Sequence, residues 1–267
     1  MREAEFGIYI YGIVSGAEPL PNMPGIDGLH PLYAILCRDL KAIVSQVSLA
    51  EFGEKPLEEK LQDLRWLEQK VRAHEAIVEQ VLGQQAILPC KFCTIYRSAG
   101  RLRNVLARYN HECHEALAFL HDKEEWGVKA YVDEEMLWHH LLQTDDELNR
   151  MEQERVGKSP GLAYLMKKTL EQHLAERMDQ TIAHFSGQLM HELGSYAVQA
   201  QEASPAALHA CPPGTHMLLN TTYLIAKEQV RPFGACARGL NERVANDGVR
   251  LVLSGPWPPY HFSPRLA

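Results

Sequence analysis

Apolar positions along the chain fall into two patterns, short β-branched and aromatic runs and longer stretches with helical spacing. The short runs predict strands at residues 6–14, 33–37, 41–47, 86–96, 126–132, 216–226 and 249–253. The helical spacing predicts helices at residues 56–82, 98–121, 134–151 and 230–245, and a longer one from residue 162 to about 203. Strands and helices therefore alternate along the whole chain.

The helix expected from residue 162 is unusually long. Some forty residues at 1.5 Å per residue would extend about 60 Å, which exceeds the width of a small domain. Gly187 and Gly194 are the places where it could break. We expect this segment either to project or to fold back as a helical hairpin.

The order of the elements predicts an α+β protein with two domains. Residues 1–123 are expected to form an N-terminal ferredoxin-like α/β sandwich. Residues 124–267 are expected to form a C-terminal α+β domain, in which long helices cover a small antiparallel sheet. The boundary is placed at the charged segment 122–125, and the length of 267 residues also favours two domains over one.

Composition and charge exclude several partners. The 27 Lys and Arg residues against 34 Asp and Glu give a net charge of −7, without a cationic cluster, so nucleic acid is not expected to bind. No window approaches the roughly 20 apolar residues that cross a bilayer, and the first residues do not resemble a signal peptide. We expect a soluble cytoplasmic protein whose six cysteines are reduced thiols, with no membrane partner.

Candidate metal and catalytic motifs are incomplete. Cys90 and Cys93 form a CxxC pair that Cys113 could complete, but residues three apart on a strand point to opposite faces, so Cys113 is expected to pack as a small hydrophobe. His74 begins an HExxH-like pattern in which Val78 replaces the second ligand, so it is expected to be a core histidine with one satisfied hydrogen bond. We predict no catalytic residue, no metal and no cofactor.

The chain ends in an aromatic, proline-rich segment, residues 253–262, called the arm below. Its three prolines restrict the backbone and remove hydrogen-bond donors, so the preceding strand should stop pairing and continue as a stiff extended arm. Rigid aromatic side chains are good anchors for a partner. The candidate partner-binding residues are Trp257, Pro258, Pro259, Tyr260 and Phe262. The alternative is that they fold back as a lid over the sheet.

Six sequence blocks follow one another along the chain, at residues 9–14, 66–75, 88–94, 126–131, 159–165 and 255–260. Taken in this order they resemble the gas vesicle protein F/L family, and the last block, GPWPPY, is the most specific. One block departs from the family pattern, because Lys91 replaces an arginine and Cys93 replaces a glycine. If that glycine allows a positive φ, Cys93 must be strained or the turn must differ.

The resemblance implies a non-catalytic accessory or minor structural protein that takes part in gas vesicle assembly. It would bind the small hydrophobic shell protein, with other gas vesicle accessory proteins as further candidates, and would be located at gas vesicles in the cytoplasm. One alternative is a small-molecule-binding or enzymatic ferredoxin-like protein, which predicts a deep cavity with convergent titratable groups. Another is a zinc-dependent nucleic-acid binder, which predicts a metal and a basic face.

Overall fold

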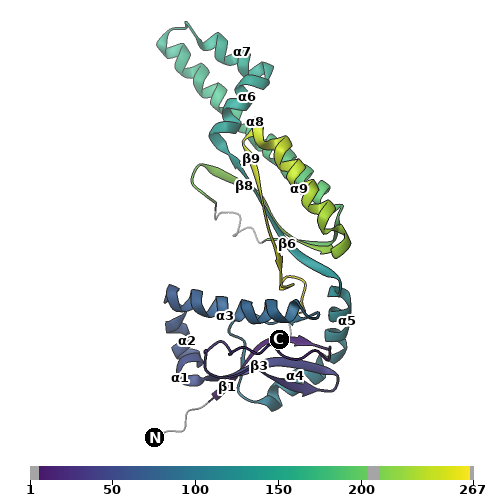
Figure 1. Cartoon of the computed structure of the whole chain (residues 1–267). Helices are drawn as coiled ribbons and strands as arrows, with labels where there is room; N and C mark the ends of the chain where they lie inside the picture. The colour runs from purple at the N-terminus through teal and green to yellow at the C-terminus, as the bar shows by residue number, and fades with distance from the viewer. Residues whose placement is uncertain (1–5, 204–210, 265–267) are drawn as a thin grey trace. The chain divides into compact units, whose positions relative to one another are not determined.

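The computed structural model describes residues 6–203 and 211–264 (Figure 1). The chain divides into two units, the first comprising Met1–Glu124 with Trp257–Ala267 and the second Glu125–Pro256. The predicted boundary after residue 123 lies one residue earlier, and all later residues were expected in the second domain. In the structure the C-terminal segment returns to the first unit.

The sheet of the first unit is antiparallel. Its strands are β1 (Phe6–Val14), β2 (Tyr33–Cys37), β3 (Leu40–Ser48), β4 (Leu88–Pro89) and β5 (Ile95–Tyr96). Their spatial order is β2-β3-β1-β4, with β5 also pairing with β1. This is the ferredoxin-like order, but the connection from β1 to β2 is a loop without a helix.

In the described part of this unit, five helices accompany the sheet: α1 (Leu49–Phe52), α2 (Glu54–Lys60), α3 (Leu64–Leu82), α4 (Ala99–Arg108) and α5 (Asn110–Leu120). The single helix predicted over residues 56–82 is two helices, because the Asp63 carboxylate accepts hydrogen bonds from the backbone N–H groups of Arg65 and Trp66 and begins α3. The helix predicted over residues 98–121 likewise divides at Tyr109. Helix α3 runs beside the sheet and buries one side in the core (Figure 1).

The strand predicted over residues 86–96 was wrong in its extent, because only its two ends pair with β1. Pro89 has no N–H to donate, and Cys93 adopts a left-handed backbone with φ of 62°. The segment between them therefore turns away from the strand direction.

The second unit contains four strands and four α-helices within the described residues. They are β6 (Lys123–Asp133), α6 (Glu134–Thr144), α7 (Asp146–Arg155), α8 (Pro160–Gly194), β7 (Ala197–Glu202), β8 (Thr215–Ala226), α9 (Val230–Val244) and β9 (Val249–Trp257). Two short 3₁₀ turns flank α9, at Lys227–Gln229 and Ala245–Asp247. The strand order β7-β8-β6-β9 repeats that of the first unit, here with helices in both crossovers.

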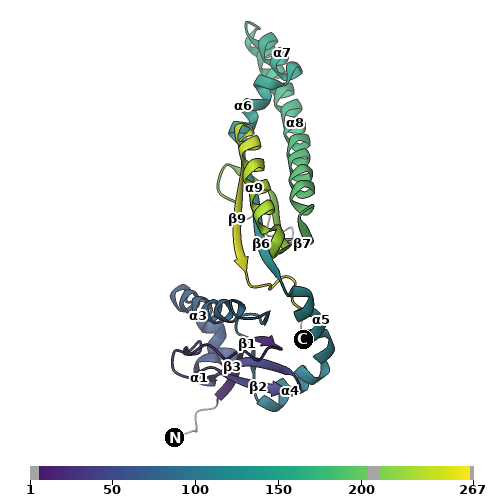
Figure 2. The same ribbon diagram turned by 45° about the vertical axis from the view of Figure 1, so that its right-hand side comes forward.

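Helix α8 dominates this unit. Its 35 residues span about 52 Å, and it ends at Gly194, one of the two predicted break points. α6 and α7 pack back against it, and α8 and α9 run beside the second sheet (Figures 1 and 2). The prediction of helix up to residue 203 was wrong, because Ala197–Glu202 pairs with β8 as strand β7.

Strand β9 is longer than predicted. The expectation that pairing stops at residue 253 was wrong, since β9 continues to Trp257. β9 lies at one end of the strand order, and an edge strand tolerates Pro256 because its missing N–H can face away from the sheet.

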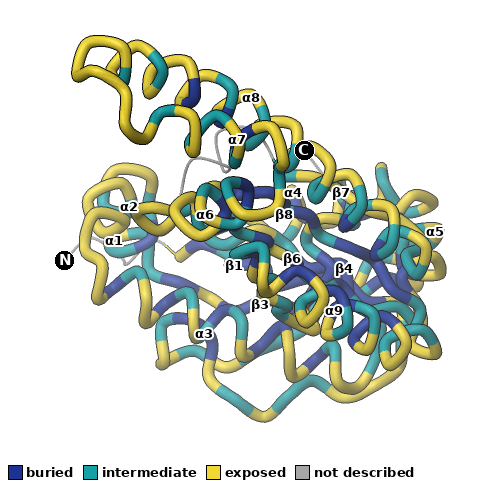
Figure 3. The backbone as a smooth tube through the Cα atoms, turned by 90° about the horizontal axis from the view of Figure 1, so that it is seen from above, coloured by how far each residue is buried: buried dark blue, intermediate teal, exposed yellow. Residues whose placement is uncertain are grey.

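Each unit has its own apolar core, drawn in dark blue in Figure 3. Tyr9, Tyr11 and Phe52 are among the largest buried side chains of the first core, and Tyr223 and Phe233 are among the largest of the second. Within the described residues, no helix has both the length and the apolar character needed to cross a bilayer. Mixed helices and antiparallel strand pairing confirm the α+β fold class.

Candidate functional site

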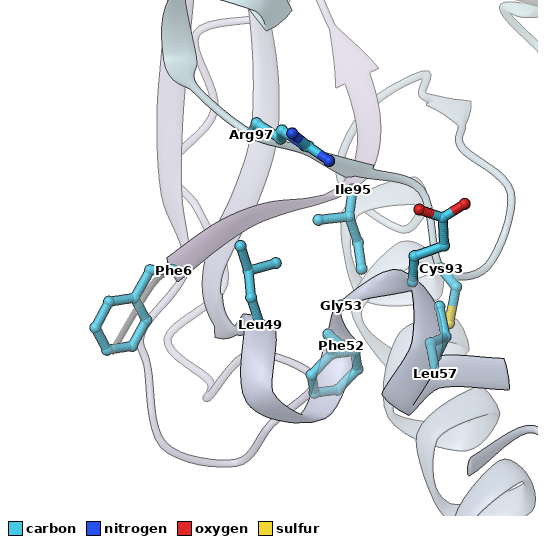
Figure 4. A pocket seen from close by; sticks show the side chains of 9 residues that line it. Phe6, Leu49, Phe52, Gly53, Leu57, Cys93, Ile95 and Arg97 are labelled. Carbon is cyan, nitrogen blue, oxygen red and sulfur yellow. The ribbon is translucent and has the colours of Figure 1, made fainter. Parts of the chain in front are cut away.

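The first unit contains an open groove of about 760 Å³. Helices α1 and α2 supply Leu49, Phe52 and Leu57 on one side, and the segment around β5 supplies Ile95 and Arg97 on the other (Figure 4). The remaining lining residues are Phe6, Gly53, Glu54 and Cys93. Most of these side chains are apolar, but the accessible surface of the groove is shared about equally between polar and apolar atoms.

Two glycines shape this groove. Gly53 ends α1 and begins α2, and a Cβ there would lie 2.4 Å from the carbonyl oxygen of Leu49, so a side chain would force the two helices to shift. A Cβ at Gly7 would lie 2.8 Å from Ile95 Cγ2 and 2.9 Å from Leu49 Cδ2. Because Gly7 and Gly53 carry no side chains, Leu49 and Ile95 can lie against the backbone of Gly7, and the groove between the two walls stays open.

Phe6, the first residue of β1, is 43% exposed and packs edge-on against the ring of His30. The His30 imidazole in turn lies 2.5 Å from the carboxylate of Asp27. Burial raises the pKa of Asp27, but hydrogen bonds from His30 and from the backbone outweigh it and lower that pKa below its usual value. A charged Asp27 therefore helps to hold an exposed aromatic ring in place.

Phe52 is held from its buried side by a lysine. The Lys70 ammonium lies 5.5 Å from the centre of the Phe52 ring, donates to the Ile26 carbonyl oxygen at 3.1 Å and lies 3.6 Å from the Glu51 carboxylate. The Trp66 indole N–H donates to the same carboxylate at 2.8 Å. This polar network fixes Phe52 without adding a polar group to the groove.

The arm does not extend freely from the first unit. Trp257 is 41% exposed, Pro258 and Pro259 are buried, and Tyr260 and Phe262 are half-buried. Of the five predicted partner-binding residues, Trp257 is thus exposed, and the other four are buried or half-buried.

Tyr260 is held by His74. The hydroxyl groups of Tyr9 and Tyr260 lie 2.9 Å and 3.1 Å from Nδ1 and Nε2 of His74, and the rings of His74 and Tyr260 are stacked. The backbone N–H of Cys93 donates to the Tyr9 oxygen at 2.9 Å. All of these bonds form together when Tyr9 donates to Nδ1 and Nε2–H donates to Tyr260.

His74 lies in the core, as predicted, but has partners at both ring nitrogens rather than one. Burial lowers its pKa to about 4, against a smaller opposing contribution from a hydrogen bond with the backbone of Cys90. The imidazole is therefore neutral at neutral pH and joins the arm to the core.

Cys93 connects this network to the groove, because its backbone bonds to Tyr9 while its side chain lines the groove. Its φ of 62° is the positive value that the replaced glycine of the family pattern would allow, so the strained alternative is the one the structure adopts. Burial raises the pKa of the Cys93 thiol to about 11, which keeps it protonated.

The chemistry available in the groove is limited. Glu54 and Arg97 are its charged residues, and both are exposed. Burial raises the pKa of Cys90 to about 12, and Cys113 is fully buried in a helix. Within the described residues, no group of three or more His, Cys, Asp or Glu side chains is arranged to hold a metal ion.

Sequence reasoning missed the groove. Its residues come from β1, two short helices and β5, and the short helices were not predicted as separate elements. The usable signal was the exposed Phe6 at the start of a buried strand, together with Gly7 and Gly53.

The geometry defines a two-unit α+β protein whose first unit offers an open groove lined mostly by apolar side chains, in contrast to a deep cavity lined by titratable groups. Solved structures share this fold: GvpF from Anabaena sp. PCC7120 matches with a TM-score of 0.68 at 19% identity, covering 97% of this chain and 98% of that one. GvpF from Microcystis aeruginosa matches with a TM-score of 0.63 at 19% identity, covering 97% and 99%.

The matches by sequence, like those by structure, cover nearly the whole chain. The family model for gas vesicle synthesis protein GvpL/GvpF matches residues 7–264. Gas vesicle protein L of Streptomyces sp. (strain CB03234) is 28% identical over 96% of this chain and 92% of its own length, and gas vesicle protein F of that strain is 29% identical over 95% and 98%. The chain belongs to the GvpL/GvpF family, and this membership supports a role in gas vesicles.

Proposed function

We propose that this protein takes part in gas vesicle assembly as a non-catalytic accessory or minor structural protein that binds the small hydrophobic shell protein. The observation that carries the proposal is the open groove of the first unit, where apolar side chains predominate beside two charged ones. A subunit whose apolar surface will form a wall must be kept from aggregating before assembly, and an apolar groove on a folded protein can cover such a surface. Family membership supports the same role.

The arm contributes a second contact in this proposal. Trp257 offers an exposed aromatic ring, whereas Pro258, Pro259 and Tyr260 fix the arm to the first unit. A ring on a fixed segment loses little conformational freedom on binding. Phe262, which is half-buried, belongs to the fixed part.

The alternative of a small-molecule enzyme has less support. It requires convergent titratable groups in an enclosed cavity, and the groove instead has Glu54 and Arg97 on its exposed rim. Among the described lining residues, the remaining titratable one is Cys93, whose thiol is protonated because burial raises its pKa to about 11.

The test is capture of co-expressed, tagged shell protein by the full chain. Phe6→Ser and Leu57→Ser change the groove, and Leu36→Ser is the matched control, since Leu36 is 58% exposed on β2 of the same unit and does not line the groove. Removal of a central apolar contact typically costs about 1–3 kcal/mol, so we expect roughly 5- to 150-fold weaker capture by the groove variants. The Leu36 variant should capture as the unmodified chain does.

The arm is tested by a second pair. Trp257→Ala should weaken capture, while Tyr260→Phe, which keeps the ring and removes one hydrogen bond, should affect it less. Absence of capture by the unmodified chain, or normal vesicle production in cells that lack it, would refute the proposed function. Unchanged capture by both groove variants would remove the groove from it.

A further inference from the structure

Helix α8 carries a continuous stripe of exposed residues that no other described element covers. Counted from the start of the helix, their spacings are three or four positions, alternating as far as Ala183, and this is the periodicity of a helix-packing seam. The stripe consists of Leu162, Leu165, Thr169, Gln172, Glu176, Asp179, Ala183 and Gly187, all exposed. The helix buries its opposite side through Leu170 and Leu174, so this face is available.

The chemistry of this stripe changes along the helix. Its first part is apolar, with Leu162 47% and Leu165 62% exposed, and Tyr164 beside them is 67% exposed. Its middle part is acidic, with Glu176 and Asp179, and its last part has only small residues. Figure 3 draws most of the α7–α8 hairpin as exposed.

Lys168 lies directly beside the stripe, next to Thr169, and is exposed. In the part of the chain that the structure describes, neither Lys168 nor the two acidic residues, Glu176 and Asp179, take part in an ion pair. The helix thus presents an unpaired cation near its beginning and unpaired carboxylates further along the same face.

We propose that α8 binds the α8 of a second copy of this chain in antiparallel orientation. A two-fold axis midway between Gln172 and Glu176 places Leu165 of each copy on Ala183 of the other, and Thr169 opposite Asp179. Ala183 leaves room for the leucine, and at Gly187 a side chain would meet nothing within 4 Å. Lys168, adjacent to Thr169, then lies within reach of Asp179 of the other copy.

The charges select this orientation. A parallel pair would place Glu176 on Glu176 and Asp179 on Asp179, and such like-charge contacts are unfavourable. The antiparallel pair instead places Glu176 opposite the neutral Gln172 and brings Asp179 close to Lys168. The stripe is therefore complementary to itself, which identifies a second copy as its occupant.

The association is expected to be weak, because few large apolar side chains are buried in it. We expect a Kd on the order of tens of micromolar. Sedimentation velocity on the full chain, from about 1 to 300 µM, should show a reversible monomer–dimer equilibrium.

Charge reversal tests the register. Lys168→Glu should weaken dimerisation about tenfold, and Lys168→Glu combined with Asp179→Lys should restore it. Lys167→Glu is the matched control, because Lys167 pairs with Glu171 of the same helix and lies off the stripe. Leu165→Glu should abolish the dimer, while circular dichroism shows that each variant remains folded.

A chain that stays monomeric over the whole range overturns the proposal. Equal weakening by Lys167→Glu and Lys168→Glu would show a net-charge effect, and failure of the double reversal to restore the dimer would show that Lys168 and Asp179 do not meet. Either result overturns the antiparallel register. These variants lie in the second unit, so their outcome is independent of shell-protein capture by the first.

Discussion

Replacement of His74 should change how the stability of this protein depends on pH. The imidazole is 2% exposed, and burial lowers its pKa from 6.5 to about 4 in the folded chain. In the unfolded chain it regains its ordinary pKa. Between these two values the unfolded state binds a proton that the folded state does not.

The sign follows from this difference. The free energy of unfolding rises with pH wherever the unfolded state binds more protons, so the contribution of His74 is complete above pH 6.5 and falls as the pH falls toward 4. Each pH unit corresponds to about 1.4 kcal/mol, so acidification across the whole interval removes about 3 kcal/mol at most.

The assay compares the unmodified chain with His74→Gln, which retains an amide able to bond to the Tyr9 and Tyr260 hydroxyls but does not titrate. Urea unfolding at several pH values gives the difference in free energy of unfolding, which should decline as the pH falls from 7 to 4. His111→Gln is the control, because the His111 side chain is 83% exposed and should meet similar solvent in both states. NMR titration of the His74 ring supplies its folded-state pKa directly. A His74 titrating near 6.5, or a difference that does not change with pH, would refute the reasoning.

Three further changes test local strain and packing by thermal or urea unfolding. Cys93→Gly should be up to about 1 kcal/mol more stable than Cys93→Ala, because the strain that glycine relieves in the left-handed backbone exceeds the conformational entropy that glycine loses on folding. As a control, Ala107→Gly in α4 should lose about 1 kcal/mol of stability. Equal stability of the two Cys93 variants would exclude strain. Tyr260→Phe should lose about 0.5–1.5 kcal/mol and expose the arm to faster proteolysis, unless its hydrogen bond to His74 contributes nothing. Gly12→Ala should cost about 1–3 kcal/mol, because the new Cβ would lie 2.8 Å from the backbone oxygen of Leu88, whereas Gly16→Ala should cost less because it meets the flexible end of Gln85.

Periodicity predicted most elements but not their interruptions. The strand over residues 6–14 and the helix after residue 230 were confirmed because each has a pure pattern and a clear end. The divisions at Asp63 and Asp145 were missed because the apolar stripe continues across them, although both aspartates accept hydrogen bonds from the backbone N–H groups two and three residues further on. A polar N-cap within a long helical pattern was the overlooked signal.

Strand β7 shows a different limit. Its residues, AVQAQE, are mostly good helix formers, and five of the six are exposed, so neither propensity nor burial indicates a strand. Its conformation depends on pairing with β8, which lies beyond it in sequence. The same limit applies to the candidate site, whose residues are brought together by tertiary contacts between β1, β5 and the two short helices.

The arm and the groove belong to one connected structure, which explains how a proline-rich ending can affect a surface formed by distant residues. Tyr260 bonds to His74, His74 to Tyr9, and Tyr9 to the backbone of Cys93, whose side chain lines the groove. Release of the arm would leave His74 without one partner and would expose a buried imidazole to water, which raises its pKa toward 6.5. Protonation of that imidazole would then remove the acceptor that orients the Tyr9 hydroxyl, whose oxygen accepts the hydrogen bond from Cys93 at the strained turn. The arm therefore stabilises the wall of the groove whether or not Trp257 itself contacts a partner. A loss of binding can be assigned to direct contact only if Trp257→Ala weakens binding more than Tyr260→Phe does.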